Sequence, residues 1–368
     1  GCCNAAIGKN ALYSNTCGCW NSAISDLALY SNTEGNWNNA IGSSALRMNT
    51  LGCHNTALGS QALYSNTCGC FNHAIGNGAL WKNTTGCCND ALGYQALYCN
   101  INGGKNIALG HQSLYYNTSG SNNVAIGCRA LMMAPSFIRD IAGSCNNIGI
   151  GEMAGQNLAT GNNNIGIGYK ANLGAACGMC GNNNIGIGCI ANQCVTSGTG
   201  NISMGNNAGG GTTTGNYSIS IGSCAGSGSQ TVGCNISIGI CAGLSHTCGC
   251  NNTALGMQAL NANTTGNYNT AIGLETLKCN TCGQSNIGIG FRNLRNNTEG
   301  DHNTALGKCA LNANTSGDWN FAVGENALKD NTTGKSNTAL GYYAMCNNCT
   351  GCYNIGIGHQ ALFEVECT

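Results

Sequence analysis

A repeat of 17 residues runs along this chain and constrains its fold more than any other feature. The glycine of the phrase A-[IL]-G recurs at Gly42, Gly59 and Gly76, and the same step continues from Gly8 to Gly358 with two interruptions. Counted from the first residue, the shared pattern is G-x-x-N-T-A-I-G-x-x-A-L-x-x-N-T-x. A short tandem repeat of this kind indicates a solenoid, in which each repeat forms one coil that packs against the next.

The residues of the repeat favour β-structure over helices. Two glycines in every coil would each cost a helix interior roughly 1 kcal/mol relative to alanine. The phrase N-T-A-I-G alternates as a strand does, A-L fits a second strand, and the glycines fit tight turns. We therefore expect an all-β protein, a single domain over residues 1–368. It would be a parallel β-solenoid of 21 coils with two short strands per coil and insertions near 134–143 and 178–180.

The alternation within the strand also predicts the buried face. Positions 5 and 7 of the repeat share one face of the strand, and positions 4, 6 and 8 share the other. Where position 5 is isoleucine, as at Ile148, position 12 often shrinks, as at Gly155. We expect these two positions to face each other across a thin core, since packed residues trade volume. This interpretation places Leu58 and Ile75, both at position 7, in one core column.

Asparagine recurs at two positions of the coil. At position 4 we expect a ladder of hydrogen bonds along one bend. Its first members are Asn4, Asn21, Asn38, Asn55, Asn72 and Asn89. At position 15 several asparagines form N-x-[ST] sequons in a turn, where they could carry glycan, although T-T-G is also ordinary turn chemistry. The glycosylation candidates are Asn83, Asn117, Asn263, Asn314 and Asn331.

Half of the 28 cysteines lie at positions 2 and 17, on either side of the first glycine of the coil. Side chains one coil apart would stack about 4.8 Å apart, a Cα separation that a disulfide accepts. We therefore expect disulfides between neighbouring coils and at the three-residue insertion. The candidates are Cys2, Cys17, Cys19, Cys53, Cys70, Cys87, Cys177, Cys180, Cys224, Cys241, Cys352 and Cys367. C-x-x-C pairs such as Cys279–Cys282 also fit zinc or redox chemistry, but no second ligand pair stands at zinc spacing.

Other chemistry has little support in the composition. Charged residues make up 7% of the chain and the formal net charge is zero, which gives no electrostatic case for nucleic acid or an acidic membrane surface. No apolar run is long enough for a membrane span, and no paired carboxylates or phosphate-binding loop stand out. We expect no enzymatic activity, no cofactor, no metal site, no nucleic-acid partner and no membrane insertion. The cysteine content favours an extracellular or virion-surface location.

Two further features bear on partners. Aromatic residues form columns at position 3, as at Trp20 and Trp37, and at position 13. These columns suit turn covers, a lateral interface or a sugar-binding strip. The first and last coils keep the repeat and resemble no cap, and Cys352 would stand against Cys2 of a following chain. We expect a homo-oligomer, either a head-to-tail filament or a homotrimer, with glycans as a second class of partner.

The phrases NTALGYYAM, GNYNTAIG and GNNNIGIG resemble repeats in the tail or surface fibres of phages and giant viruses. They are also similar to the head β-roll of trimeric adhesins of the YadA type, and the resemblance covers essentially the whole chain. It implies a homotrimer. The sequence therefore predicts a structural protein that forms an extracellular or virion-surface fibre, assembling end to end and stabilised by disulfides. The alternative is a trimeric adhesin or tail-fibre shaft that binds cell-surface glycans. Ice binding is disfavoured because no regular Thr-x-Thr array is present.

Overall fold

The computed structural model describes residues 1–132, 143–175, 178–228, 231 and 233–364. The chain divides into two compact units, Gly1–Ile187 (unit 1) and Gly188–Thr368 (unit 2). Each unit is a parallel β-solenoid, and its described residues contain no helix. The predicted all-β solenoid with a repeat of about 17 residues is therefore confirmed. Most of the insertion expected near 134–143 lies outside the described residues, and the prediction of one domain over 1–368 stays a prediction.

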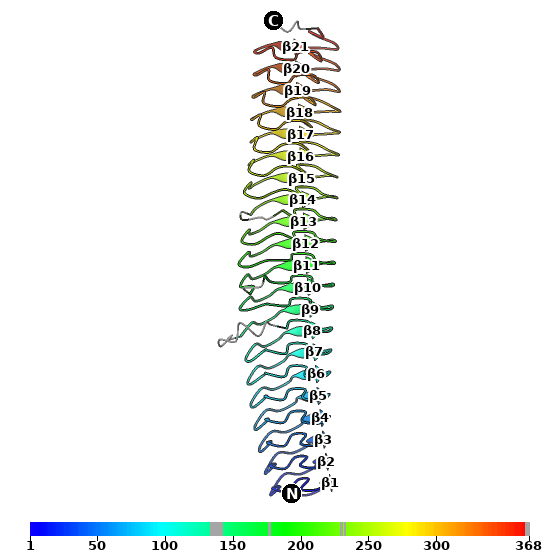
Figure 1. Ribbon diagram of the computed structural model, residues 1–368, viewed down its shortest axis with the longest axis vertical. Coiled ribbons are helices and arrows are strands. Elements are labelled where there is room, and N and C mark those ends of the chain that lie inside the picture. Colours follow the sequence, from blue (N-terminus) through cyan, green and yellow to red (C-terminus); the bar gives the residue numbers. More distant parts are fainter. Residues whose placement is uncertain (133–142, 176–177, 229–230, 232, 365–368) are drawn as a thin grey trace. The chain divides into compact units, whose positions relative to one another are not determined.

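Each coil contributes one strand of three residues, formed by positions 5 to 7 of the repeat (Figure 1). The strands of unit 1 are β1 (Ala5–Ile7), β2 (Ser22–Ile24), β3 (Asn39–Ile41), β4 (Thr56–Leu58), β5 (His73–Ile75), β6 (Asp90–Leu92), β7 (Ile107–Leu109), β8 (Val124–Ile126), β9 (Ile148–Ile150), β10 (Ile165–Ile167) and β11 (Ile185–Ile187). Those of unit 2 are β12 (Ile202–Met204), β13 (Ile219–Ile221), β14 (Ile236–Ile238), β15 (Thr253–Leu255), β16 (Thr270–Ile272), β17 (Ile287–Ile289), β18 (Thr304–Leu306), β19 (Phe321–Val323), β20 (Thr338–Leu340) and β21 (Ile355–Ile357).

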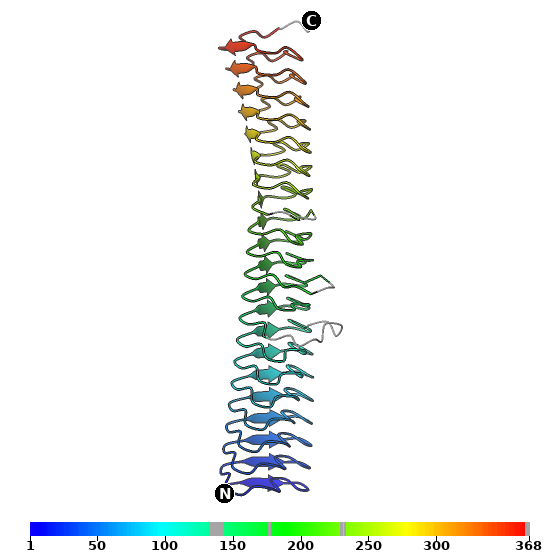
Figure 2. The ribbon, with the colours of Figure 1, turned by 90° about the vertical axis from the view of Figure 1, so that its left-hand side faces the viewer.

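Neighbouring strands within a unit pair in parallel, with equivalent residues opposite each other. Ala57 of β4 pairs with Ala74 of β5, and Ala322 of β19 pairs with Ala339 of β20. In the orange and red coils of unit 2, the strands lie on one side and the turns extend to the other (Figure 2). Because the register never shifts within these pairs, every position of the repeat becomes a column of similar side chains.

The second strand expected in each coil is absent from the described residues, and this part of the prediction is wrong. The A-L segment is a turn in which positions 10 and 12 take the left-handed conformation, with φ of 58° at Gln61 and 52° at Leu63. The segment is still bonded from coil to coil, because the Leu63 N–H donates to the Ala79 carbonyl at 2.9 Å. Glycine and asparagine at position 12, as at Gly155 and Asn172, are the residues that tolerate this conformation best.

The strand also faces the opposite way from the prediction. Position 6 is buried and positions 5 and 7 point outward, so Ala74 is fully buried while Ile75 is 39% exposed. Leu58, which was expected in the core, lies on the outer face and is half-buried. The interior is too narrow for isoleucine on the strand, because leucine at position 12 already reaches across it. A Cβ added to Gly149, at position 6, would lie 2.8 Å from Cγ of Leu131, at position 12 of the preceding coil.

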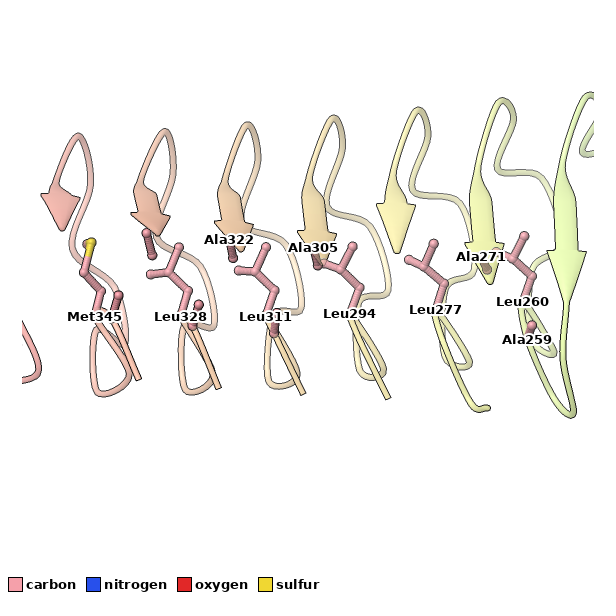
Figure 3. Packing of buried hydrophobic residues seen from close by; sticks show 14 of the residues in the cluster. Ala259, Leu260, Ala271, Leu277, Leu294, Ala305, Leu311, Ala322, Leu328 and Met345 are labelled. Atoms are coloured by element: carbon pink, nitrogen blue, oxygen red, sulfur yellow. The ribbon is translucent and has the colours of Figure 1, made fainter. Parts of the chain in front are cut away.

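The core of each unit is thus built from alanine at positions 6 and 11 and leucine at position 12. In unit 2, Leu294 points toward the strand that carries Ala305, and Leu311 points toward the strand that carries Ala322 (Figure 3). All of these side chains are fully buried. Burying one leucine side chain contributes roughly 2 kcal/mol, so the repeated column is a main source of stability in these coils.

Coils with glycine or asparagine at position 12 replace the missing volume at the bend, and not at position 5 as the sequence suggested. Position 15 holds Leu158 in unit 1 and Val195 and His246 in unit 2, all buried. Met179, from the three-residue insertion, is also fully buried and forms an isolated bridge with Leu158. A larger side chain at position 15 therefore compensates for a smaller one at position 12, because both fill the same interior.

Glycine at position 8 allows neighbouring coils to approach closely. At Gly59 the backbone has a φ of 135°, and an added Cβ would lie 2.7 Å from the carbonyl carbon of Gly76 in the next coil. A side chain there would push the coils apart, so the conformation and the contact both require glycine.

Candidate functional surfaces

The outer face of the strands is a regular surface that repeats in every coil. In unit 1 it is apolar at both outward positions over β7–β11, and in unit 2 over β12–β14. We call these two stretches the apolar outer faces. They consist of Ile107, Leu109, Val124, Ile126, Ile148, Ile150, Ile165, Ile167, Ile185 and Ile187 in unit 1 and Ile202, Met204, Ile219, Ile221, Ile236 and Ile238 in unit 2. Parallel strands in register make each face a continuous row of apolar side chains, and a contiguous exposed apolar surface marks an interaction site more often than a scattered one.

The same face is polar near the start of unit 1. Position 5 is Ser22, Asn39 and Thr56 in β2–β4, and then His73 and Asp90. The His73 Nδ1 and Asp90 Oδ1 atoms are 2.7 Å apart on this exposed surface. A surface pair of this kind contributes at most about 1 kcal/mol. The polar residues at position 5 of β2–β6 interrupt the apolar surface before β7, although position 7 stays apolar in these strands.

The predicted ladder at position 4 is present. The Oδ1 of Asn38 accepts the backbone N–H of Asn55 at 3.1 Å and the Asn55 side-chain amide at 3.1 Å, and that amide also donates to the Gly69 carbonyl at 2.8 Å. Asn21 and Asn4 are joined in the same way through the Asn21 N–H. The six predicted members, Asn4, Asn21, Asn38, Asn55, Asn72 and Asn89, all take part.

A second asparagine ladder runs along position 15, where the sequence suggested glycans. The Nδ2 of Asn66 donates to Oδ1 of Asn49 at 2.8 Å and to the Gly69 carbonyl at 2.9 Å. The five glycosylation candidates occupy this ladder or its continuation in unit 2, and none is more than 4% exposed: Asn83, Asn117, Asn263, Asn314 and Asn331. The nitrogen that would carry the sugar is a buried donor in each of them, so the folded coil contradicts glycosylation at these positions.

The cysteines of position 2 act as hydrogen-bond acceptors. The Cys53 N–H donates to Sγ of Cys70 at 3.1 Å, and the Cys70 N–H donates to Sγ of Cys87 at 3.2 Å. In other coils Asn36 or Asp301 accepts the equivalent N–H through its side-chain oxygen. A thiol at position 2 therefore replaces an amide or carboxylate in a regular coil-to-coil bond, a role that the sequence interpretation missed.

The disulfide candidates are free thiols wherever the structure describes them, and Cys177 and Cys367 lie outside the described residues. The Sγ atoms of Cys2 and Cys19 are 3.3 Å apart, so this pair is placed for oxidation. The Cys2 N–H lowers the pKa of the Cys19 thiol, whereas the hydrogen bond to Cys19 raises the pKa of Cys2.

The other disulfide candidates occupy varied settings. Burial and the nearby Cys224 thiol raise the pKa of Cys241. Cys352 accepts the Lys335 N–H at 3.2 Å, and the remaining candidates, Cys17 and Cys180, are exposed. Predicted disulfides between coils therefore stay a prediction.

The aromatic columns form stacked ladders. The rings of Trp20 and Trp37 lie 5.0 Å apart with planes 5° from parallel, and His54 and Phe71 continue the stack at 6.2 and 4.8 Å. Each ring covers the face of its neighbour, so the ladder presents mainly ring edges to solvent. Sugars bind aromatic residues through the ring face, and this geometry therefore favours a structural role. Burial also raises the pKa of Tyr115, in the second ladder, to about 12.

The densest charge cluster surrounds one carboxylate of unit 2. Glu275 Oε1 lies 2.9 Å from Lys278 Nζ, and Oε2 lies 2.8 Å from Arg292 Nε and 3.0 Å from Arg295 Nε. Hydrogen bonds from Lys278 and Arg295 lower the pKa of Glu275 to about 2. Among the described residues, no group of three or more His, Cys, Asp or Glu side chains is arranged to hold a metal ion. The same residues contain no helix that is long and apolar enough to cross a membrane.

Comparison with known proteins adds no assignment. No protein-family model matches the chain, and no curated protein matches its sequence. The resemblance to viral fibres and to YadA-type adhesins therefore stays a prediction.

Proposed function

We propose that this protein is a structural component of an extracellular or virion-surface fibre, in which copies of the chain associate through the apolar outer faces. The observation that carries this proposal is the row of outward isoleucines, such as Ile165 and Ile167, on β7–β11 of unit 1. Ile167 is 36% exposed, and its neighbours Ile150 and Ile187 in the row are half-buried. An apolar surface of this kind is stabilised when a second copy covers it.

The interior supports a structural role. Two asparagine ladders and an alanine–leucine core repeat with little variation over β2–β8, which suits a stiff shaft more than an adaptable binding site. End-to-end assembly and disulfide staples belong to this proposal as secondary features. The pair Cys2–Cys19 is the best placed of the thiols for such a staple.

Light scattering coupled to size-exclusion chromatography tests the proposal. The double variant Ile165→Lys/Ile167→Lys places two charges on the apolar outer face of unit 1 and should yield monomer, whereas the unmodified chain should yield a multimer. Both side chains point outward, so the variant should keep its β-structure by circular dichroism. The matched control is Tyr169→Lys, an exposed position of the same coil outside the strand, which should leave the multimer intact. A monomeric unmodified chain at micromolar concentration would contradict the proposal.

A further inference from the structure

Position 2 of the repeat forms a relay in which each coil accepts a backbone N–H from the coil before it. Cys70 accepts from Cys53, Ser121 accepts from Gly104, and Cys145 accepts from Ser121, at 3.0–3.3 Å. The relay is broken at Gly104, which has no side chain to accept the N–H of Cys87. No described residue accepts that N–H in its place.

A surface pocket of about 360 Å³ lies at this break. Its polar lining includes Thr85, Asn102, Lys105 and Asn122, together with the two thiols Cys87 and Cys88. No described residue hydrogen-bonds the Thr85 hydroxyl, the side-chain amides of Asn102 and Asn122 or the Lys105 ammonium, and Lys105 has no ion-pair partner among them. The pocket therefore combines one cation, one unpaired backbone donor and several free hydroxyl and amide groups.

Another coil of the chain shows which side chain can accept a backbone N–H at position 2. In unit 2, Oδ1 of Asp318 accepts the backbone N–H of Asp301 at 2.9 Å, which is the bond that Cys87 lacks. The other oxygen of the same carboxylate lies 2.7 Å from Nζ of Lys335. A carboxylate thus satisfies position 2 by joining a backbone N–H to a lysine. At Gly104 a backbone N–H and a lysine are also present without a carboxylate, but Lys105 lies at position 3 of the same coil, whereas Lys335 lies at position 2 of the coil after Asp318.

The second glycine at position 2 shows that glycine alone does not make a site. A Cβ added to Gly233 would lie 1.8 Å from the carbonyl oxygen of Asn216 and 2.5 Å from its nitrogen, so the two coils are in direct contact there. At Gly104 the nearest atom to an added Cβ is the Cys87 carbonyl oxygen at 2.9 Å, and the Cys87 nitrogen is 3.8 Å away. The coils are therefore less crowded above Cys87 than above Asn216, although a side chain at Gly104 would still press against the Cys87 carbonyl oxygen.

We infer that this pocket binds a carboxylate carried by a small hydroxyl-rich molecule, of the size and chemistry of an acidic sugar. One carboxylate oxygen accepts the Cys87 N–H, and the Lys105 ammonium neutralises the charge. The Thr85 hydroxyl and the amides of Asn102 and Asn122 bond the sugar hydroxyls. A volume of about 360 Å³ holds one such unit. The site is independent of the proposed fibre, because the pocket lies on the turn side of position 2 and not on the outward strand residues.

Amide NMR of the full chain labelled with ¹⁵N-cysteine tests this inference, with the Cys87 signal identified by its loss in Cys87→Ser. Sodium glucuronate should shift the Cys87 amide downfield in a saturable way. Acetate should shift it in the same direction at about tenfold higher concentration, since it lacks the hydroxyls. Glucose, which lacks the carboxylate, should leave the signal in place. A Cys87 amide that ignores glucuronate, or that responds equally to glucose, would overturn the inference.

Two variants separate the parts of the site. Gly104→Asp supplies the carboxylate internally, so the Cys87 amide should lie downfield without ligand and stop responding to glucuronate. Lys105→Gln should weaken glucuronate binding by about threefold to tenfold, as expected for loss of one partly exposed charge. The matched control is Lys82→Gln, an exposed lysine outside the pocket, which should leave the affinity unchanged. Equal affinities for Lys105→Gln and the unmodified chain would show that no anion is recognised.

Discussion

Two kinds of coil fill the same narrow interior in different ways. In unit 1, the coil of β5 buries Leu80 at position 12 and Asn83 at position 15, where the amide belongs to a ladder. The coil of β9 has Gly155 at position 12 and buries Leu158 at position 15, where no amide ladder runs. Unit 2 contains the same two kinds of coil in the opposite order along the chain. We call them ladder coils and apolar-bend coils.

The difference shows that the side chains at positions 12 and 15 together fill a similar volume in both kinds of coil, whereas their polarity differs. A buried amide is tolerated at the bend only where neighbours on both sides complete its hydrogen bonds, and leucine then fills position 12. Without those neighbours the bend holds Leu158 or Val195 in two of these coils, and position 12 shrinks to a residue such as Gly155 or Asn172, which also suits the left-handed backbone. In each kind of coil the residues at positions 12 and 15 depend on each other. Replacing one of them by its counterpart from the other kind of coil should therefore lower the free energy of unfolding.

The largest effect is expected when an amide is moved into an apolar-bend coil. Leu158→Asn removes buried apolar volume beside Met179 and leaves an unpaired amide inside, which should lower the local free energy of unfolding by about 4 kcal/mol. Hydrogen exchange of the β9 and β10 backbone amides measures this loss. Leu158→Met, which keeps volume and polarity, should cost less than about 1.5 kcal/mol. Equal protection in both variants would remove the distinction between the two kinds of coil.

His246 stands where the two kinds of coil meet in unit 2, and it makes that boundary sensitive to pH. The imidazole is fully buried, neither of its nitrogens has a partner among the described residues, and burial lowers its pKa from 6.5 to about 4. Above pH 6.5 the ring is neutral in both states. Between pH 6.5 and 4 the unfolded chain binds a proton that the folded chain excludes, so stability falls by about 3 kcal/mol as the pH decreases, with no further loss from this group below pH 4.

The variant His246→Asn isolates this effect. It removes the titrating group and supplies an acceptor for Asn263, extending the ladder by one rung. The free energy of unfolding, measured by urea denaturation at pH 7 and pH 4, should change less with pH in this variant than in the unmodified chain. Identical pH profiles for the two proteins would show that His246 is not buried as a neutral ring.

A smaller effect is expected when a ladder amide is replaced by an apolar residue. Asn66→Leu removes the donor to Asn49 Oδ1 and the acceptor of the Asn83 side-chain amide, while the Gly69 carbonyl keeps its bond from Asn55 and the new side chain recovers some apolar burial. The expected loss is about 2 kcal/mol, measured by hydrogen exchange in β4 and β5. Asn77→Ala, at an exposed position, is the control and should change stability by less than about 0.5 kcal/mol.

The smallest effect is expected for substitutions on the outer face of the strands. Ile75→Thr in a ladder coil and Ile167→Thr in an apolar-bend coil both alter outward strand residues, so each should change monomer stability by about 0.5 kcal/mol. Thermal unfolding of Ile75→Thr in the Ile165→Lys/Ile167→Lys background, and of Ile167→Thr in dilute monomer, provides the measurement. A loss of several kcal/mol at Ile75 would restore the inward strand face that the sequence first suggested.

The sequence predicts the period, the parallel stacking and the position 4 ladder because these depend only on which residue types recur at each position of the repeat. It does not predict which strand face is buried, since alternation defines two faces and leaves their assignment to packing. The restriction of position 6 to small residues, as at Ala74 and Gly149, was the available signal for a narrow interior. The second strand was missed for a related reason. A leucine such as Leu63 gives no local sign of a left-handed backbone, which appears only where Gly155 or Asn172 replaces it.

Surface chemistry was harder to predict than the fold. N-x-[ST] at Asn83 is indistinguishable in sequence from an exposed sequon, and only the coil geometry turns its amide inward. The acceptor role of Cys70 depends on the neighbouring coil, so no local motif reveals it. The pocket at Gly104 arises from a missing side chain in a column and becomes visible only when equivalent positions are compared in space.

Sedimentation equilibrium with and without reductant tests the central claim, that the apolar outer faces and not the thiols join copies of the chain. The account predicts a multimer that persists in excess reductant and falls to monomer in Ile165→Lys/Ile167→Lys under both conditions. A multimer that reductant dissolves, or that survives the double substitution, would contradict it.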